Sequence, residues 1–191
     1  MLLVYFVVNL FLLTTEYAEI SERKRDFTDG FFSMNTTLSA FDREFISLDS
    51  GSRSLLAKVR EEKLFDKPRD VPNSMAMFSC GEYILRSAAM VEKTFGGITT
   101  RLWDDPFEWT LPEKMADHES IYRYMDEVEA TRLKGFAFFT SDDDLSRQIP
   151  APEKLRPIIE IFLDTLAKAA HFQGRAFAVF QMISDEKIPK I

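Results

Sequence analysis

The chain has 191 residues, of which 46% are hydrophobic and 18 are phenylalanine, so it can bury a full core and fits a single domain. A formal net charge of −7 argues against nucleic acid as the main partner, because affinity for phosphate backbones depends on clustered Lys and Arg. The single cysteine, Cys80, excludes an internal disulfide, and two histidines cannot supply a three-histidine metal site within one chain. A cytoplasmic location is the simpler interpretation of this cysteine content.

The first 13 residues, Met1–Leu13, are almost wholly apolar but shorter than the roughly 20 residues that a membrane-spanning helix needs. No basic residue precedes them, so the signal-peptide pattern is incomplete, and export is the alternative if residues 1–18 act as a signal. The segment could also be a helix docked on the domain, or sequence upstream of a true start at Met34. We therefore divide the chain into an apolar extension, 1–33, and a bundle domain, 34–191, and predict no membrane span.

Apolar residues recur at helical spacing in four segments of the domain. The first helix is predicted from Leu38 to about Arg60. Ser79 and Glu82 form the S-x-x-E pattern of a capping box and start the second helix, whose apolar positions continue to Phe95.

A breaker-rich stretch, 104–112, then predicts a long crossover. The third helix is expected from about Ser120, with apolar positions continuing to Phe139, and the aspartates at 142–144 indicate a solvated turn. The last helix is predicted over 153–184. No segment alternates as a strand does, so the predicted fold class is all-α, a four-helix bundle with a long crossover connection.

Two segments of the predicted second and last helices carry recognisable motifs, SCGEYILR at 79–86 and KAAHFQG at 168–174. They resemble the metal-binding segments of the DinB/YfiT-like helical bundles (the DinB superfamily), in which G-E-x-x-x-His is answered near the C-terminus by His-x-x-x-His-x-Gly. The resemblance implies a DinB-like four-helix bundle. It also implies a homodimer, as resembling proteins often are dimeric.

The histidine positions of these motifs hold other residues in this chain. Anchoring on Gly81-Glu82 puts Arg86 at the first position, and anchoring on Gly174 puts Lys168 and Phe172 at the other two. In the family, the three histidines hold a divalent metal such as nickel or zinc, and some members use it to activate the thiol of a small cofactor. Two cations and a phenyl ring offer no electron pair to a metal, so we expect a degenerate metal site with no metal and no other cofactor.

A positively charged pocket could replace the metal. Arg86 and Lys168 on facing helices would suit a carboxylate or phosphate, with His171 and Phe172 beside them. The alternative is that each cation pairs with an acid of its own. The acids considered are Glu82, Glu92 and Asp164.

Other candidate residues have simpler structural interpretations. Trp103 and Trp109 lie on or beside the crossover and could form an aromatic lid over such a pocket, or cover the end of the core. Cys80 indicates a buried structural thiol rather than a nucleophile. His171 is better explained as a hydrogen-bonded core or interface residue than as a general base, and His118 borders the third helix.

These patterns leave two classes of function open. The first is a bundle without the three-histidine site that binds a small anionic molecule or a protein partner. The alternative is a thiol-dependent transferase or hydrolase of the DinB/YfiT-like type with a non-standard site. The sequence does not decide whether the protein is an enzyme.

Overall fold

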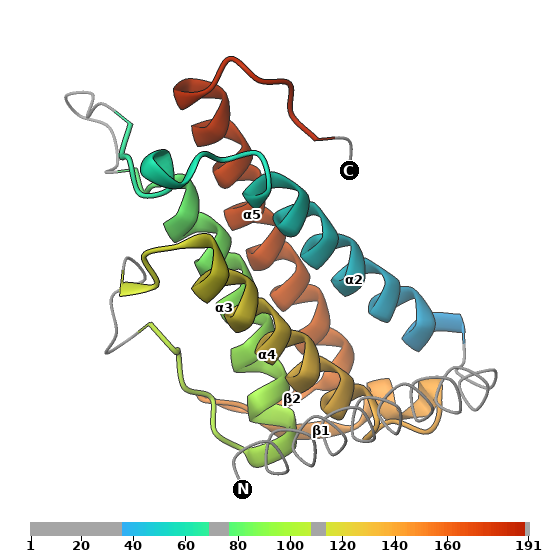
Figure 1. Cartoon of the computed structure of the whole chain (residues 1–191). Coiled ribbons are helices and arrows are strands. Elements are labelled where there is room, and N and C mark those ends of the chain that lie inside the picture. Colours follow the sequence, from blue (N-terminus) through green and yellow to red (C-terminus); the bar gives the residue numbers. More distant parts are fainter. Residues whose placement is uncertain (1–35, 69–76, 108–113, 190–191) are drawn as a thin grey trace, which may run out of the picture. The chain divides into compact units, whose positions relative to one another are not determined.

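The computed structural model describes residues 36–68, 77–107 and 114–189, and in this part of the chain four long helices form a bundle (Figure 1). The helices are α2 (Thr36–Leu56), α3 (Cys80–Thr100), α4 (His118–Phe136) and α5 (Ile158–Ile183). The predicted all-α four-helix bundle is confirmed. None of these described helices combines the length and hydrophobicity needed to cross a membrane. The apolar extension, 1–33, lies outside the described residues.

The helices run in an order that requires a long crossover. Figure 1 shows α3 and α4 running side by side in the same direction, with α2 and α5 running the opposite way. The starts of α2 and α5 lie at one end of the bundle. There the Asp142 carboxylate accepts from the Leu38 N–H, and the Arg147 carbonyl accepts from the Ile158 N–H. Because α3 and α4 are parallel neighbours, the connection between them must return along the bundle, as predicted.

The last helix starts later than predicted. Residues 155–157 form β2 (Leu155–Pro157), which pairs antiparallel with β1 (Gln148–Pro150), so α5 begins at Ile158 and not at Glu153. Pro157 disfavours a helical conformation at the residue before it, which keeps Arg156 extended. The expectation that the domain holds no strand was therefore wrong for this hairpin.

The remaining helix ends follow local signals more closely. The capping box is confirmed, since Ser79 Oγ accepts from the Glu82 N–H and Glu82 Oε2 accepts from the Ser79 N–H at 2.7 Å. The third helix begins at His118, because the side chain of Asp117 caps it by accepting from the Ser120 N–H. The first helix ends at Leu56, four residues before the predicted end.

The aspartates at 142–144 are not merely a solvated turn. They lie in the short 3₁₀ helix η4 (Asp142–Ser146), and the Asp142 carboxylate accepts from the N–H groups of Thr37 and Leu38 at 3.0 and 2.9 Å. The first N–H groups of a helix have no partner within the helix. Asp142 therefore caps α2 from a position more than a hundred residues later in the chain.

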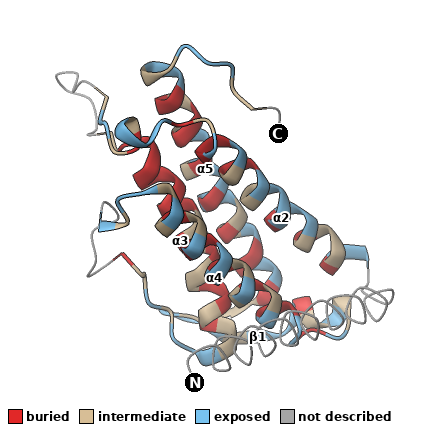
Figure 2. Cartoon of the chain, viewed as in Figure 1, coloured by how far each residue is buried: buried red, intermediate tan, exposed pale blue. Residues whose placement is uncertain are grey.

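A cluster of phenylalanines fills the end of the bundle where α2 and α5 begin. Phe162 of α5 is fully buried, and its ring lies 5.3–5.6 Å from the rings of five others. These are Phe41, Phe45, Phe95, Phe136 and Phe139. Figure 2 shows the buried residues on the inner faces of the helices and the exposed ones outside. Edge-to-face and tilted ring pairs of this kind add to the stabilisation gained by burial.

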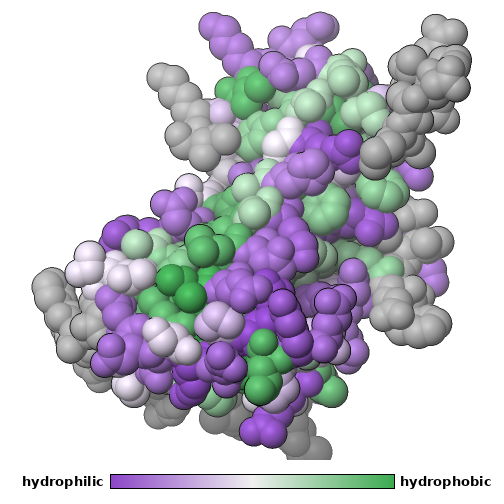
Figure 3. Space-filling view, turned by 180° about the vertical axis from the view of Figure 1, so that it is seen from behind, coloured by the Kyte–Doolittle hydropathy of each residue, from purple (hydrophilic) through white to green (hydrophobic). Residues whose placement is uncertain are grey.

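The surface is mixed rather than uniformly polar. Seen from behind, hydrophobic side chains gather among hydrophilic ones (Figure 3). On α5, Ile159 is 38% and Leu163 is 56% exposed, and the small residues Ala167 and Ala170 are exposed as well. The outer face of α5 is therefore partly apolar.

Candidate functional site

The buried seam where α5 meets α3 and α2 includes Ser87, Ala169 and Gln173, each one residue after a position that the family motif suggested. Ser87 of α3 donates to the Ala169 carbonyl of α5 at 2.9 Å, and Gln173 of α5 donates to Ser52 Oγ of α2 at 2.8 Å. Ser87, Ala169 and Gln173 are all buried. Because one residue turns a helix by about 100°, the predicted ligand positions 86, 168 and 172 lie towards the edge of this seam.

These seam residues do not suit a metal. They offer a hydroxyl, a methyl and a carboxamide, whereas nickel or zinc needs donors such as imidazole nitrogens, and the amide and hydroxyl are already hydrogen-bonded within the bundle. Across the described residues, no three side chains of His, Cys, Asp or Glu gather as a metal site requires. The donor set therefore does not fit a divalent metal bound in the manner of the family.

The four predicted pocket residues do not all meet. Lys168, His171 and Phe172 line a shallow hollow of about 450 Å³ on α5. Met90 and Ala167 complete its lining, and we call it the apolar hollow. Arg86 is not part of this lining, because its guanidinium carbon lies 4.2 Å above the ring of Phe78.

Lys168 has the acidic partner that the simpler interpretation proposed. Its Nζ lies 2.8 Å from Asp164 Oδ2, one helical turn earlier. Hydrogen bonding to Lys168 is the largest effect on Asp164 and, against the opposing effect of burial, it lowers the pKa of this carboxyl below the ordinary 3.8. A second cation, Arg156, lies 3.4 Å from the same carboxylate oxygen and 2.8 Å from Glu160 Oε1.

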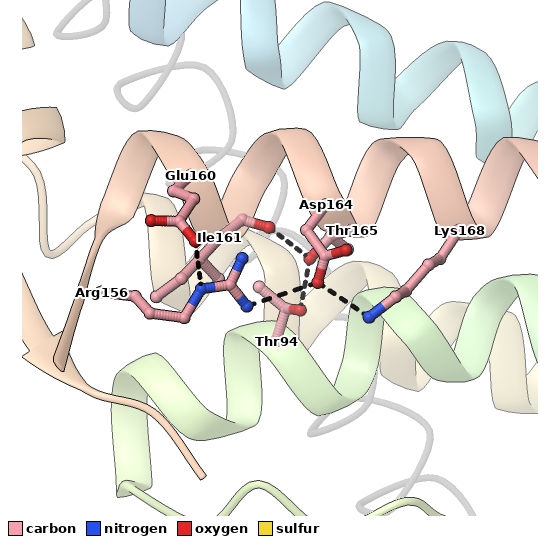
Figure 4. Close-up of polar contacts among 7 residues, drawn as sticks. All are labelled: Thr94, Arg156, Glu160, Ile161, Asp164, Thr165 and Lys168. Atoms are coloured by element: carbon pink, nitrogen blue, oxygen red, sulfur yellow. Dashed lines mark hydrogen bonds and ion pairs between the residues drawn. The ribbon is translucent and has the colours of Figure 1, made fainter. Parts of the chain in front are cut away.

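These charges border a second space, a cavity of about 320 Å³ that we call the polar cavity. Its lining comes from α3 (Met90, Lys93, Thr94), from the residue Trp103, from the hairpin turn (Ala151, Pro152, Glu153) and from β2 and α5 (Arg156, Ile161, Asp164, Thr165, Lys168). Figure 4 shows Arg156 and Lys168 reaching Asp164 beside a pair of threonines. The cavity is within the size range of small-molecule sites.

The threonine pair joins α3 to α5 through oriented hydroxyls. Thr94 Oγ1 and Thr165 Oγ1 lie 2.6 Å apart, and both residues are buried. Thr165 Oγ1 also donates to the Ile161 carbonyl at 2.8 Å. Because a hydroxyl has one proton, Thr94 is then the donor in the pair. Its oxygen keeps lone pairs that could accept a hydrogen bond from a ligand.

Lys93 differs from the other two cations of the polar cavity. Arg156 and Lys168 are both paired with Asp164, whereas the ammonium group of the half-buried Lys93 has no hydrogen bond or ion pair with any described residue. The lining holds three cations and two carboxylates, and Glu160 just outside it also pairs with Arg156, so Lys93 is the lining cation that no described carboxylate pairs with. This charge favours an anion over a cation as a ligand.

Trp103 forms one wall of the polar cavity because the chain turns back after α3. Arg101 ends the helix with a left-handed φ of 62°, and Trp103 Nε1 then donates to the Pro150 carbonyl of the hairpin at 3.1 Å. A Cβ on Gly97 would lie 2.3 Å from Trp103 Cδ2, so only glycine leaves room for the indole ring. Trp109, the other half of the predicted lid, lies outside the described residues.

The sulfur and imidazole groups lie away from this cavity's lining. Cys80 is fully buried, its Sγ donates to the Ala176 carbonyl, and burial raises the pKa of its thiol to about 12. This agrees with the structural role predicted for it. His171 is exposed on α5, so the core position considered for it was wrong. His118 is the first residue of α4.

Most residues that line the polar cavity were not predicted from the sequence. One pattern in the sequence could have indicated part of it. Residues 156, 160, 164 and 168 recur every four positions with the charges of Arg, Glu, Asp and Lys, which is the spacing of ion pairs along a helix. Thr94 and Thr165 carry no such signal, because 71 residues separate them.

Comparison with known proteins supports the fold. No family model matches the chain, and no curated protein matches it. The fold is similar to the crystal structure of a DinB-like protein from Bacillus cereus ATCC 10987, with a TM-score of 0.59 over 80% of this chain and 96% of that one. At 12% sequence identity, this similarity shows the DinB-like fold and nothing of the activity.

Proposed function

We propose that this DinB-like bundle binds a small anionic molecule in the polar cavity, through Lys93, Arg156 and Lys168. The observation that carries the proposal is Lys93, a half-buried cation that lines the cavity and whose ammonium group has no partner among the described residues. A carboxylate or phosphate would pair with Lys93 and compete with Asp164 for the other two cations. Thr94 would supply a neutral hydrogen-bonding group beside the charged ones.

Binding is favoured over the transferase or hydrolase alternative by the chemistry of the lining. The described residues that line the polar cavity include neither histidine nor cysteine, and the two threonine hydroxyls are hydrogen-bonded to each other. Nucleophilic catalysis needs a nucleophile next to a base that can take its proton. We also propose that no divalent metal is bound, so the purified protein should carry no stoichiometric nickel or zinc. Elemental analysis after dialysis would check this.

The anion proposal can be tested with the cavity's own tryptophan. The chain has two tryptophans, so Trp109→Phe leaves Trp103 as the single indole and makes its fluorescence a reporter of the polar cavity. Titration with acetate, succinate and inorganic phosphate should change this fluorescence and raise the melting temperature. Acetate and phosphate distinguish a carboxylate site from a phosphate site.

A matched pair of variants locates the effect. Lys93→Gln should weaken anion binding by about 10- to 100-fold, the range expected when one charged hydrogen bond is lost. Lys134→Gln removes the same charge from an exposed position on α4 and should leave the affinity unchanged. Equal affinities in the two variants, or no response of Trp103 to any of the anions, would contradict the proposal.

The homodimer, the protein partner and the cytoplasmic location stay predictions. Light scattering during size-exclusion chromatography of the full chain would check the first, and fractionation of native cells would check the last.

A further inference from the structure

The polar cavity and the apolar hollow adjoin each other. Met90 of α3 and Lys168 of α5 belong to the lining of both. Beyond these two residues the linings differ in character. Lys93 and Thr94 belong to the polar cavity, whereas Ala167, His171 and Phe172 belong to the apolar hollow. We call these two adjoining spaces, of about 320 and 450 Å³, the groove; the first is its charged end and the second its apolar end.

The groove has its cations at the charged end and at the junction. Lys93 lies in the polar cavity, and Lys168 lies where the two spaces meet. A small anion bound by these lysines would leave Met90, Ala167 and Phe172 facing water. A ligand with an apolar chain attached to the anion would cover them, and each methylene buried in this way strengthens binding by about three- to four-fold.

We infer that the ligand is an amphipathic anion, a carboxylate or phosphate carrying a straight apolar chain. Its head group lies in the polar cavity and its chain lies along Ala167 and Phe172 in the apolar hollow. The inference rests on the proposed function for the head group and adds the chemistry of the rest of the ligand. Charge selects the head, and the mainly apolar lining beyond Lys168, which also includes His171, selects the tail.

A chain-length series tests the tail separately from the head. Calorimetric titration of the full chain with acetate, butyrate, hexanoate and octanoate should show affinity that rises about three-fold or more with each added methylene. Octyl phosphate should bind as octanoate does if the site accepts either head group. Octyltrimethylammonium has the same tail with the opposite charge and should bind at least ten-fold more weakly than octanoate.

Two alanine variants on α5 then place the tail. Ala167→Gln puts a polar side chain into the apolar hollow and should flatten the dependence on chain length while leaving acetate binding intact. Ala170→Gln makes the same exchange at an exposed position outside the hollow's lining and should preserve the dependence.

The possible failures differ in what they overturn. If acetate and phosphate bind but affinity does not rise with chain length, the amphipathic ligand is wrong and the anion site stands. If no carboxylate and no phosphate binds, both proposals fail. Equal binding of the ammonium compound would show a purely apolar site and overturn the inference.

Discussion

Helices α3 and α5 pack against each other at two neighbouring places that are filled in different ways. At one, Phe95 and Phe162 lie 5.5 Å apart in the phenylalanine cluster. At the other, Thr94 and Thr165 meet through hydroxyls, and a cavity of about 320 Å³ lies beside them. Thr94 directly precedes Phe95 in the chain. Short buried side chains between the two helices therefore leave a cavity beside them, whereas the aromatic rings one residue further along α3 pack against one another.

The largest effect should come from the ring cluster. Phe162→Ala removes a fully buried ring that contacts five others, and we expect the free energy of unfolding to fall by about 3–5 kcal/mol. Urea denaturation followed by circular dichroism measures the loss. Leu163→Ala, at the adjacent position that is 56% exposed, should cost less than about 0.5 kcal/mol. Similar losses in both variants would mean that the cluster is not packed as described.

A steric test at the cavity wall should have the next largest effect. Gly97→Ala places a Cβ 2.3 Å from Trp103 Cδ2, so the indole must move, at a cost of about 1–3 kcal/mol. A red shift of Trp103 fluorescence in the Trp109→Phe background would report its exposure to water. In Gly96→Ala the nearest atom lies at 3.6 Å, an ordinary contact, so this control should leave the spectrum unchanged. An unchanged spectrum in Gly97→Ala as well would place Trp103 elsewhere.

The pair Thr94 and Thr165 should contribute less to stability than the phenylalanine cluster or the contact between Gly97 and Trp103. Thr165→Val keeps the shape but leaves the buried Thr94 hydroxyl without its acceptor, which should cost about 1–2 kcal/mol in chemical denaturation. Thr131→Val is the control, because Thr131 on α4 makes the same bond to a carbonyl one turn back without a second hydroxyl. We expect that control to cost under about 0.5 kcal/mol. Equal costs would show that the contact between the two threonines adds nothing.

The smallest effect on stability is expected from Asp164→Asn, below about 1 kcal/mol, because its ion pairs are largely exposed to solvent. The pKa of Asp164 is lowered in the folded state, so its contribution is present above the ordinary value of 3.8 and is lost as the pH falls through the lowered value. Melting temperatures of the two proteins should therefore differ at pH 7 and converge under acid conditions.

Asp164→Asn also tests how the polar cavity binds an anion. Without the Asp164 carboxylate, Arg156 and Lys168 become available to a ligand, so Asp164→Asn should bind acetate more tightly than the unaltered chain. Asp143→Asn removes an exposed carboxylate from η4 and should change neither the affinity nor the acid behaviour. Weaker binding in Asp164→Asn would show that this carboxylate belongs to the ligand site as a partner and not as a competitor.

Local patterns in the sequence determined the helices and one of their starts. The spacing of apolar residues predicted four helices, and the capping box at Ser79 and Glu82 was confirmed because all of its partners lie within one turn. The presence of Arg86, Lys168 and Phe172 at the positions that the resemblance aligns with the motif histidines is likewise readable from the residues alone. What these three side chains touch is not.

The tertiary structure decided the features that join distant segments. The pairing of β1 with β2 moved the start of α5, and Asp142 caps α2 from 104 residues away. The polar cavity exists because Thr94 and Thr165 meet across 71 residues and the hairpin lies against Trp103. Periodicity reveals which face of a helix is buried, but the rotation of one helix against another follows from packing of the whole core. A difference of one residue, about 100°, therefore separated the predicted pocket residues from the buried seam.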